Sequence, residues 1–133
     1  MVLKNTVKMS QDIVADALNL IMNSLRKRTN LVSAKHYSKF LLSVLAIGKL
    51  HNYINDYHIE GKLLHIEFGD KLNACRAVKP HYLVRSDEIM KYVRRYLPSR
   101  NMGILVISTS KGLMTHHTAL EQNIGGSIIA YFY

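Results

Sequence analysis

The chain has little cysteine, little proline and no tryptophan: one Cys and two Pro occur in 133 residues. The single cysteine, Cys75, excludes an internal disulfide and is typical of a reducing compartment. Its apolar-flanked position favours a small buried side chain over a nucleophile. No apolar run approaches the length of a membrane-spanning helix, and the stretch Met1–Met9 is too polar for a signal peptide. We therefore expect a cytoplasmic protein that is not bound to a membrane.

Acidic residues are also scarce. Nine Asp and Glu stand against eighteen Lys and Arg, which gives a net charge of +9 and a pI near 9.8. In a protein this small, such a charge favours a polyanionic partner, and a merely soluble basic protein is the alternative. The two ends of the chain are the more basic parts, while the stretch from Leu41 to Pro80 is nearly neutral. With 48% apolar residues the chain can nevertheless bury a core.

The first half reads as helix, strand, helix, strand, strand. Ser10 is expected to cap a helix that ends near Arg26, because apolar residues recur at three- and four-residue steps between them. A short extended piece leads to a second helix, with Tyr37 and Phe40 on its inner face and Gly48 at its end. A hairpin over residues 51–68 follows, with alternating apolar residues in its second strand.

The second half opens with an extended segment, Leu72–Val84, which leads to a helix between Ser86 and Pro98. A buried strand, Ile104–Ile107, a short helix capped by Thr115 and a last alternating strand complete it. We predict an α+β fold of two small subdomains. Residues 1–70 would form an N-terminal α-β-α-β-β subdomain, and residues 71–133 a C-terminal antiparallel sheet with helices.

A run of hydroxyls, Ser108-Thr109-Ser110-Lys111-Gly112, breaks the buried strand. Hydroxyls, backbone N–H groups and one ammonium in such a loop suit phosphate and sugar oxygens. Thr109 and Ser110 offer hydroxyls that can donate to such oxygens. An ordinary strand-turn-helix connection is the alternative from spacing alone.

Catalytic and metal-binding patterns are not evident. The adjacent His116 and His117 cannot converge on one ion from a helix and are interpreted as a surface pair, and the other five histidines show no ligand spacing. We expect no metal and no cofactor. Tyr92 and Tyr96, four residues apart and beside two arginines, fit either an RNA contact or a half-buried surface. Tyr82, in an irregular stretch, is a candidate for stacking or phosphate contact.

Several segments together resemble one family. They are Ile13–Leu18, Lys35–Lys39, Leu97–Arg100, Gly103–Ala119, Gly125-Gly126 and Tyr131–Tyr133. Nearly the whole chain, from about Asp12, is similar to small-subunit ribosomal protein eight in its archaeal and eukaryotic branch. The chain departs from the family pattern at Leu120 and Glu121, and it matches loosely over Asn73–Leu83.

The resemblance implies a structural, non-enzymatic ribosomal protein. Such a protein binds the central domain of small-subunit ribosomal RNA early in assembly and lies beside other small-subunit proteins. It has no small-molecule substrate and no membrane partner, and in a eukaryote its assembly would begin in the nucleus or nucleolus. The candidate RNA-binding residues are Ser108, Thr109, Ser110, Lys111, Gly112, Thr115, Tyr82, His81, Lys79, Arg100, Lys35, Arg26, Lys27 and Arg28.

Two other functions fit parts of the pattern. A small nucleotide-dependent enzyme could use the Ser108–Gly112 run for phosphate, but the sequence offers no base, no metal site and no complete phosphate loop. An RNA-binding regulator outside the ribosome would share the same chemistry and differ only in location.

Overall fold

The computed structural model describes residues 2–78, 83–99 and 101–133, with side chains described from residue 13 onward. The chain divides into two units, Met1–Gly69 and Asp70–Tyr133. Within the described residues, no helix is both long enough and apolar enough to cross a membrane.

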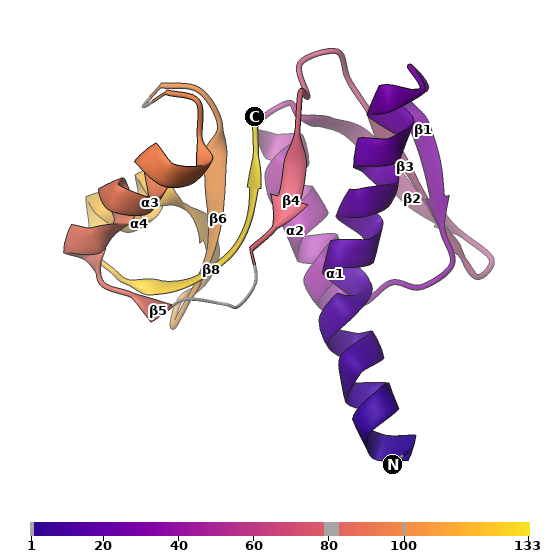
Figure 1. Cartoon of the computed structure of the whole chain (residues 1–133), viewed down its shortest axis with the longest axis horizontal. Coiled ribbons are helices and arrows are strands. Elements are labelled where there is room, and N and C mark those ends of the chain that lie inside the picture. Colours follow the sequence, from indigo (N-terminus) through magenta and orange to yellow (C-terminus); the bar gives the residue numbers. More distant parts are fainter. Residues whose placement is uncertain (1, 79–82, 100) are drawn as a thin grey trace. The chain divides into compact units, whose positions relative to one another are not determined.

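The first unit consists of two helices and a three-stranded antiparallel sheet (Figure 1). Its elements are α1 (Val2–Arg26), β1 (Leu31–Ala34), α2 (Lys39–Leu50), β2 (Ile54–Glu60) and β3 (Leu63–Phe68). The strand order is β1-β3-β2. This is the predicted helix-strand-helix-strand-strand order.

One face of this sheet is buried and the other is open to solvent. Leu64, Ile66 and Phe68 of β3 are almost fully buried, whereas the alternate residues His65 and Glu67 are partly or fully exposed. Both helices pack beside the sheet, α1 on β1 and α2 on β2. The period of two in β3 therefore separates a core face from an outer face.

Four details of the two helices differ from the sequence-based expectation. The first helix begins at Val2, because no Gly or Pro interrupts residues 2–10, so Ser10 lies within the helix and does not cap it. The second helix is capped by Ser38, whose hydroxyl accepts a hydrogen bond from the Leu41 N–H at 3.2 Å. Tyr37 therefore precedes it, and Gly48 is a buried position inside it. Phe40 points outward and is 39% exposed.

The second unit has a five-stranded antiparallel sheet with short helices. Strands β4 (Cys75–Ala77), β8 (Gly126–Phe132), β6 (Ile104–Thr109) and β7 (Gly112–Thr115) lie in that order, and β5 (Leu83–Val84) pairs with a different part of β8. The helices are η1 (Ser86–Glu88, a 3₁₀ turn), α3 (Ile89–Tyr96) and α4 (His116–Gln122). The α+β class is confirmed in both units.

The core of the second unit lies between the sheet and α3 with α4. Ile89, Val93 and Leu97 are buried, as the helical spacing predicted, and they pack with Leu105 and Ile107 of β6. Cys75 is fully buried, and desolvation raises the pKa of its thiol to about 12. This agrees with the prediction of a small structural side chain at that position.

Candidate nucleic-acid interface

The hydroxyl run Ser108–Gly112 forms the closed end of a β-hairpin. The predicted break after Ile107 is wrong: β6 continues through Thr109, with Ser110 and Lys111 as the two turn residues and Gly112 as the first residue of β7. The strand continues because Ser108 pairs with Leu113 on one side and with Ser127 on the other. Gly112 has φ +109°, a conformation that side-chain-bearing residues rarely adopt.

The Thr109 hydroxyl holds this turn together. It accepts a hydrogen bond from the Lys111 N–H at 3.1 Å and donates one to the Gly112 carbonyl at 2.9 Å. Both bonds lie within the hairpin, so this hydroxyl is already engaged. Contact between Thr109 and RNA stays a prediction, and in this structure the hydroxyl proton is directed to the Gly112 carbonyl.

Ser110 and Lys111 are the accessible polar groups of the turn. Both residues are exposed, and Ser108 is half-buried behind them. Within the part of the chain that the structure describes, no hydrogen bond or ion pair involves the side chains of these three residues. The turn thus presents an unused hydroxyl and an unpaired ammonium on a hydrogen-bonded frame, which is what contact with a phosphate or sugar oxygen requires.

Gly126 allows the chain to pass close to this hairpin, and Gly125 allows it to pass close to Val84 and Arg85. A Cβ on Gly126 would overlap the Ser108 carbonyl oxygen and lie 3.0 Å from Thr109 Cγ2, and a Cβ on Gly125 would overlap the Val84 carbonyl oxygen. Only glycine fits at these two positions, because the neighbouring atoms are largely backbone. Gly126 therefore allows the first residue of β8 to lie against the end of β6, and Gly125 allows the preceding residue to lie against Val84 and Arg85.

Thr115, the last residue of β7, and His116, the first residue of α4, are buried. Thr115 caps α4 as predicted, its hydroxyl accepting a hydrogen bond from the Thr118 N–H at 3.4 Å. The prediction of a surface histidine pair is wrong for His116, which is 1% exposed and whose Nδ1 accepts a hydrogen bond from the Leu105 N–H at 3.1 Å. His117 alone of the pair is exposed.

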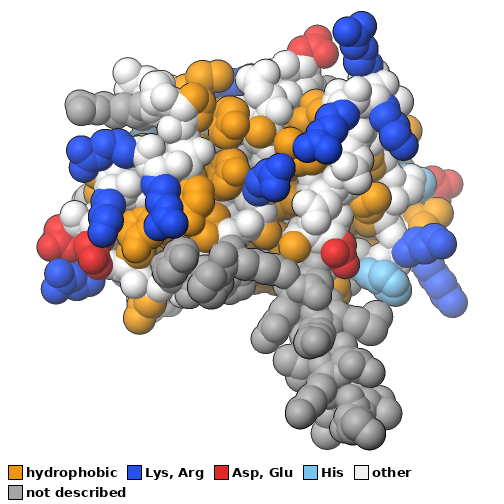
Figure 2. All heavy atoms as spheres, viewed as in Figure 1, with side chains coloured by type: hydrophobic (Ala, Val, Ile, Leu, Met, Phe, Trp, Pro, Cys, Tyr) orange, Lys and Arg blue, Asp and Glu red, His pale blue; other side chains and the backbone are white. Residues whose placement is uncertain are grey.

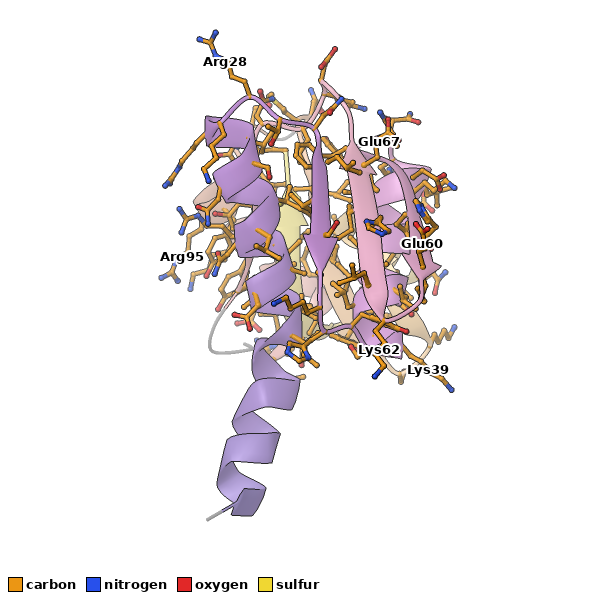
Figure 3. The ribbon with its side chains drawn as sticks, turned by 90° about the vertical axis from the view of Figure 1, so that its right-hand side faces the viewer. Arg28, Lys39, Glu60, Lys62, Glu67 and Arg95 are labelled. Carbon is orange, nitrogen blue, oxygen red and sulfur yellow. The ribbon has the colours of Figure 1, made fainter. Side chains whose placement is uncertain are left out.

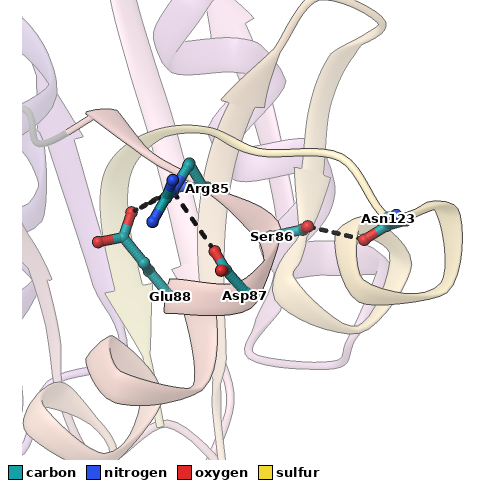
Figure 4. A network of polar contacts seen from close by, with 5 residues as sticks. All are labelled: Arg85, Ser86, Asp87, Glu88 and Asn123. Carbon is teal, nitrogen blue, oxygen red and sulfur yellow. Dashed lines mark hydrogen bonds and ion pairs between the residues drawn. The ribbon is translucent and has the colours of Figure 1, made fainter.

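A polar network that the sequence did not indicate links η1 to the end of α4 (Figure 4). The Ser86 hydroxyl donates a hydrogen bond to Asn123 Oδ1 at 2.7 Å. Beside it, Arg85 Nε lies 3.6 Å from both Asp87 Oδ1 and Glu88 Oε1. Arg85 is thus an exposed cation with two acidic neighbours, which makes it a weaker phosphate ligand than Lys111, for which the described residues offer no acidic partner.

In the first unit, basic residues follow the end of α1. Arg28 has φ +60°, and the Thr29 N–H donates to the Ser24 carbonyl while the Arg28 N–H donates to the Leu25 carbonyl. This is the Schellman arrangement, in which glycine is the usual residue at the left-handed position. Here Arg28 occupies it, and Arg26, Lys27 and Arg28 are all exposed.

Lys35 is also exposed and follows β1. It lines a pocket of about 380 Å³ with His36, Ser33 and α1 residues such as Asp16 and Leu20. Figure 2 shows Lys and Arg side chains spread over the face drawn, with few Asp or Glu side chains among them. The other predicted contacts, Lys79, His81, Tyr82 and Arg100, lie outside the described residues.

Four tyrosines of the second unit form a continuous stack. Ring centroids are 6.5 Å apart for Tyr92 and Tyr96, 5.5 Å for Tyr96 and Tyr131, and 5.9 Å for Tyr131 and Tyr133. All four are partly buried against the core. Desolvation raises the pKa of Tyr131. The stack accounts for the spacing of Tyr92 and Tyr96 as packing, with Arg95 over the Tyr96 ring at 5.6 Å.

One cluster of potential metal ligands in the first unit was not predicted from the sequence. His58, Glu60 and His65 each direct one ligand atom toward the others, and these atoms all lie within 4.8 Å of one another. The cluster spans two strands, so the spacing of histidines along the chain does not reveal it.

Comparison with known proteins gives a consistent result. The family profile described as Ribosomal protein S8 matches residues 12–133. The chain is 40% identical over 129 residues to "Small ribosomal subunit protein uS8" of Nanoarchaeum equitans, covering 94% of this chain and all of that protein. It is 34% identical over 128 residues to "Small ribosomal subunit protein uS8A" of Schizosaccharomyces pombe, covering 92% of this chain and 98% of that protein.

Proposed function

The chain belongs to the ribosomal protein S8 family, and from this membership we propose that it binds the central domain of small-subunit ribosomal RNA and supports assembly of that subunit. As a member of this family it is a non-enzymatic structural protein of the small ribosomal subunit. Its proposed partners are this RNA and the neighbouring small-subunit proteins. We place it in the cytoplasm, with assembly beginning in the nucleus or nucleolus if the source is a eukaryote.

The observation that carries the proposal is the hairpin end. Ser110 and Lys111 are exposed and have no partner among the described side chains, while Thr109 and Gly112 lock the turn behind them. A rigid turn loses little conformational entropy when it binds, so each new contact contributes more of its energy to affinity. Gly126 holds this end against β8. We infer that Ser110 and Lys111 make the direct contacts and that Thr109 and Gly112 position them, while Thr115 is buried and caps α4.

The basic residues of the first unit supply a second contact. Arg26, Lys27, Arg28 and Lys35 are exposed, and none of them has an acidic partner among the described residues. Such cations raise the affinity for RNA by binding its phosphates, but they add little preference for one sequence over another. Lys79, His81, Tyr82 and Arg100 remain proposed contacts.

Filter binding with the full-length chain tests the proposal. A central-domain fragment of small-subunit ribosomal RNA is compared with a fragment of equal length from another domain, in a series of salt concentrations. We expect tighter binding to the central-domain fragment and a log–log salt slope of about −0.9 for each phosphate neutralised. Equal binding to both fragments would contradict the proposed target. Sedimentation of cell extract separates a ribosomal protein, which migrates with small subunits, from an RNA-binding regulator, which stays in a free pool.

A further inference from the structure

We propose that His58, Glu60 and His65 form a Zn²⁺ site on the outer face of the three-stranded sheet in the first unit. The sequence predicted no metal, and RNA binding by the hairpin of the second unit does not use these residues. The proposal depends on their geometry, on a hydrogen bond behind one of them, and on the charge of the surrounding face.

The register of the sheet brings the three side chains together. His58 of β2 is directly opposite His65 of β3, and the centroids of their rings are 5.1 Å apart. Glu60 is two residues beyond His58 on the same face of the same strand. Its Oε2 lies 3.5 Å from His65 Nε2 and 3.9 Å from His58 Nε2.

These separations suit a tetrahedral metal ion. Ligand atoms about 2.0–2.2 Å from Zn²⁺ in tetrahedral geometry lie roughly 3.3–3.6 Å from each other. The two distances from the Glu60 carboxylate are within a few tenths of an ångström of that spacing, and all three ligand atoms fall within 4.8 Å. Small side-chain rotations would close the remaining gap, and Glu60 and His58 are free to make them because their side chains are 77% and 60% exposed.

A third strand provides the support that metal-bound histidines usually have. Ser33 of β1 is opposite His65, and its Oγ lies 2.8 Å from His65 Nδ1. When Nδ1–H donates to this hydroxyl, Nε2 carries the free lone pair and faces Glu60. Metal-ligating histidines almost always donate the other ring N–H to an oxygen in this way. One row across the sheet therefore contains Ser33, His65 and His58 in that order. The two histidines are the metal ligands, and Ser33 supports His65 from β1.

The local charge also favours a cation. In a chain with a net charge of +9, the outer face of this sheet carries three of the nine acids, Asp56, Glu60 and Glu67. Figure 3 shows Glu60 and Glu67 on this sheet. Asp56 is paired with Lys49 at 3.2 Å, and this hydrogen bond is the main reason why the pKa of Asp56 is lowered. Glu60, beside two imidazoles, is therefore the carboxylate that is available to a metal.

The ligand set selects the class of metal. Two imidazoles and one carboxylate, with a fourth position open to water, form a set that Zn²⁺ commonly uses, whereas Mg²⁺ and Ca²⁺ prefer oxygen ligands. We therefore expect Zn²⁺ to bind and Mg²⁺ at the same concentration not to bind.

Isothermal titration of the metal-free, full-length protein with ZnCl₂ tests the site. We expect one Zn²⁺ per chain in the wild type and loss of that binding in His58→Ala and Glu60→Gln. Both residues are exposed, and circular dichroism would verify the fold of each variant. Ser33→Ala should weaken binding about 10- to 100-fold through the orientation of His65. The control His36→Ala changes an exposed histidine of the same unit and should bind as the wild type does.

A second readout is thermal melting, since a ligand that binds only the folded state raises the Tm. We expect excess Zn²⁺ to raise the Tm of the wild type and of His36→Ala but not that of Glu60→Gln. Absence of saturable binding by the wild type would overturn the proposal. So would undiminished affinity in His58→Ala and Glu60→Gln, because the ion would then bind elsewhere.

Discussion

Gly126 offers a sensitive test of how the hairpin end is held in place. Its backbone passes so close to Ser108 that an added Cβ would overlap the carbonyl oxygen and lie 3.0 Å from both Ser108 C and Thr109 Cγ2. Two of the three atoms belong to the backbone of β6, so the new methyl group can be accommodated only if two paired strands separate. Gly126→Ala should therefore destabilise the protein by an overpacking cost at the upper end of the usual range, about 2–3 kcal/mol.

This cost corresponds to a decrease in Tm of roughly 10–20 °C for a cooperative unit of this size. Thermal melting followed by circular dichroism measures it, and Ser127→Ala, the next residue of the same strand and half-buried, is the control. That control should stay within about 0.5 kcal/mol of the wild type, because it adds no atoms. If the Tm of Gly126→Ala lies within about 2–3 °C of the wild-type Tm, the free-energy cost is well below the expected value. That result would refute the close approach of β8 to β6.

Three further predictions concern the second unit. Val106→Asp should abolish cooperative melting, because Val106 is fully buried in β6. An unpaired charge there costs at least several kcal/mol, which is a large part of a domain's stability. A native circular dichroism spectrum with a cooperative melt would contradict this prediction. Thr109→Val should lower stability by about 1 kcal/mol through loss of the hydrogen bonds with Lys111 and Gly112, and Thr109→Ser should restore it, as chemical denaturation would show. Cys75 should resist thiol reagents at pH 8 until the chain unfolds, and rapid labelling of the native protein would contradict its burial. The pKa of the folded thiol, about 12, exceeds the value of about 8.5 for a free thiol. The contribution of Cys75 to the free energy of unfolding should therefore be complete below pH ~8.5 and decline as the pH rises toward 12.

Local patterns predicted much of the fold. The alternation of Leu64, Ile66 and Phe68 gave the buried face of β3, and Thr115 was recognised as a helix cap because its hydroxyl precedes a short helical stretch. The start of α1 was not predicted, because Ser10 is a good cap residue that the continuous helix simply passes through. β7 was missed because Gly112–Thr115 is too short to show a period, and it becomes a strand only by pairing with β6.

The candidate site was predicted by residue type rather than by contact. The sequence indicated which hydroxyls gather near Lys111 but not that Thr109 uses its own within the turn. The sequence pattern indicated that His116 lies at the surface, whereas in the fold its Nδ1 accepts a hydrogen bond from the Leu105 N–H. The pairing of His58 with His65 depends on strand register, which is set by long-range packing and not by local spacing.

The affinity of a hairpin variant for RNA tests the central claim most directly. Ser110→Ala combined with Lys111→Gln removes the two turn side chains that have no partner among the described residues. Lys62→Gln, which removes an exposed lysine from the turn between β2 and β3, is the control. Filter binding to the central-domain fragment should weaken about 5- to 150-fold for the double variant, which is 1–3 kcal/mol. Its log–log salt slope should become shallower by about 1. The control should bind as the wild type does, and both variants should melt at the wild-type temperature. Unchanged affinity of a folded double variant would contradict the assignment of this hairpin as the RNA contact.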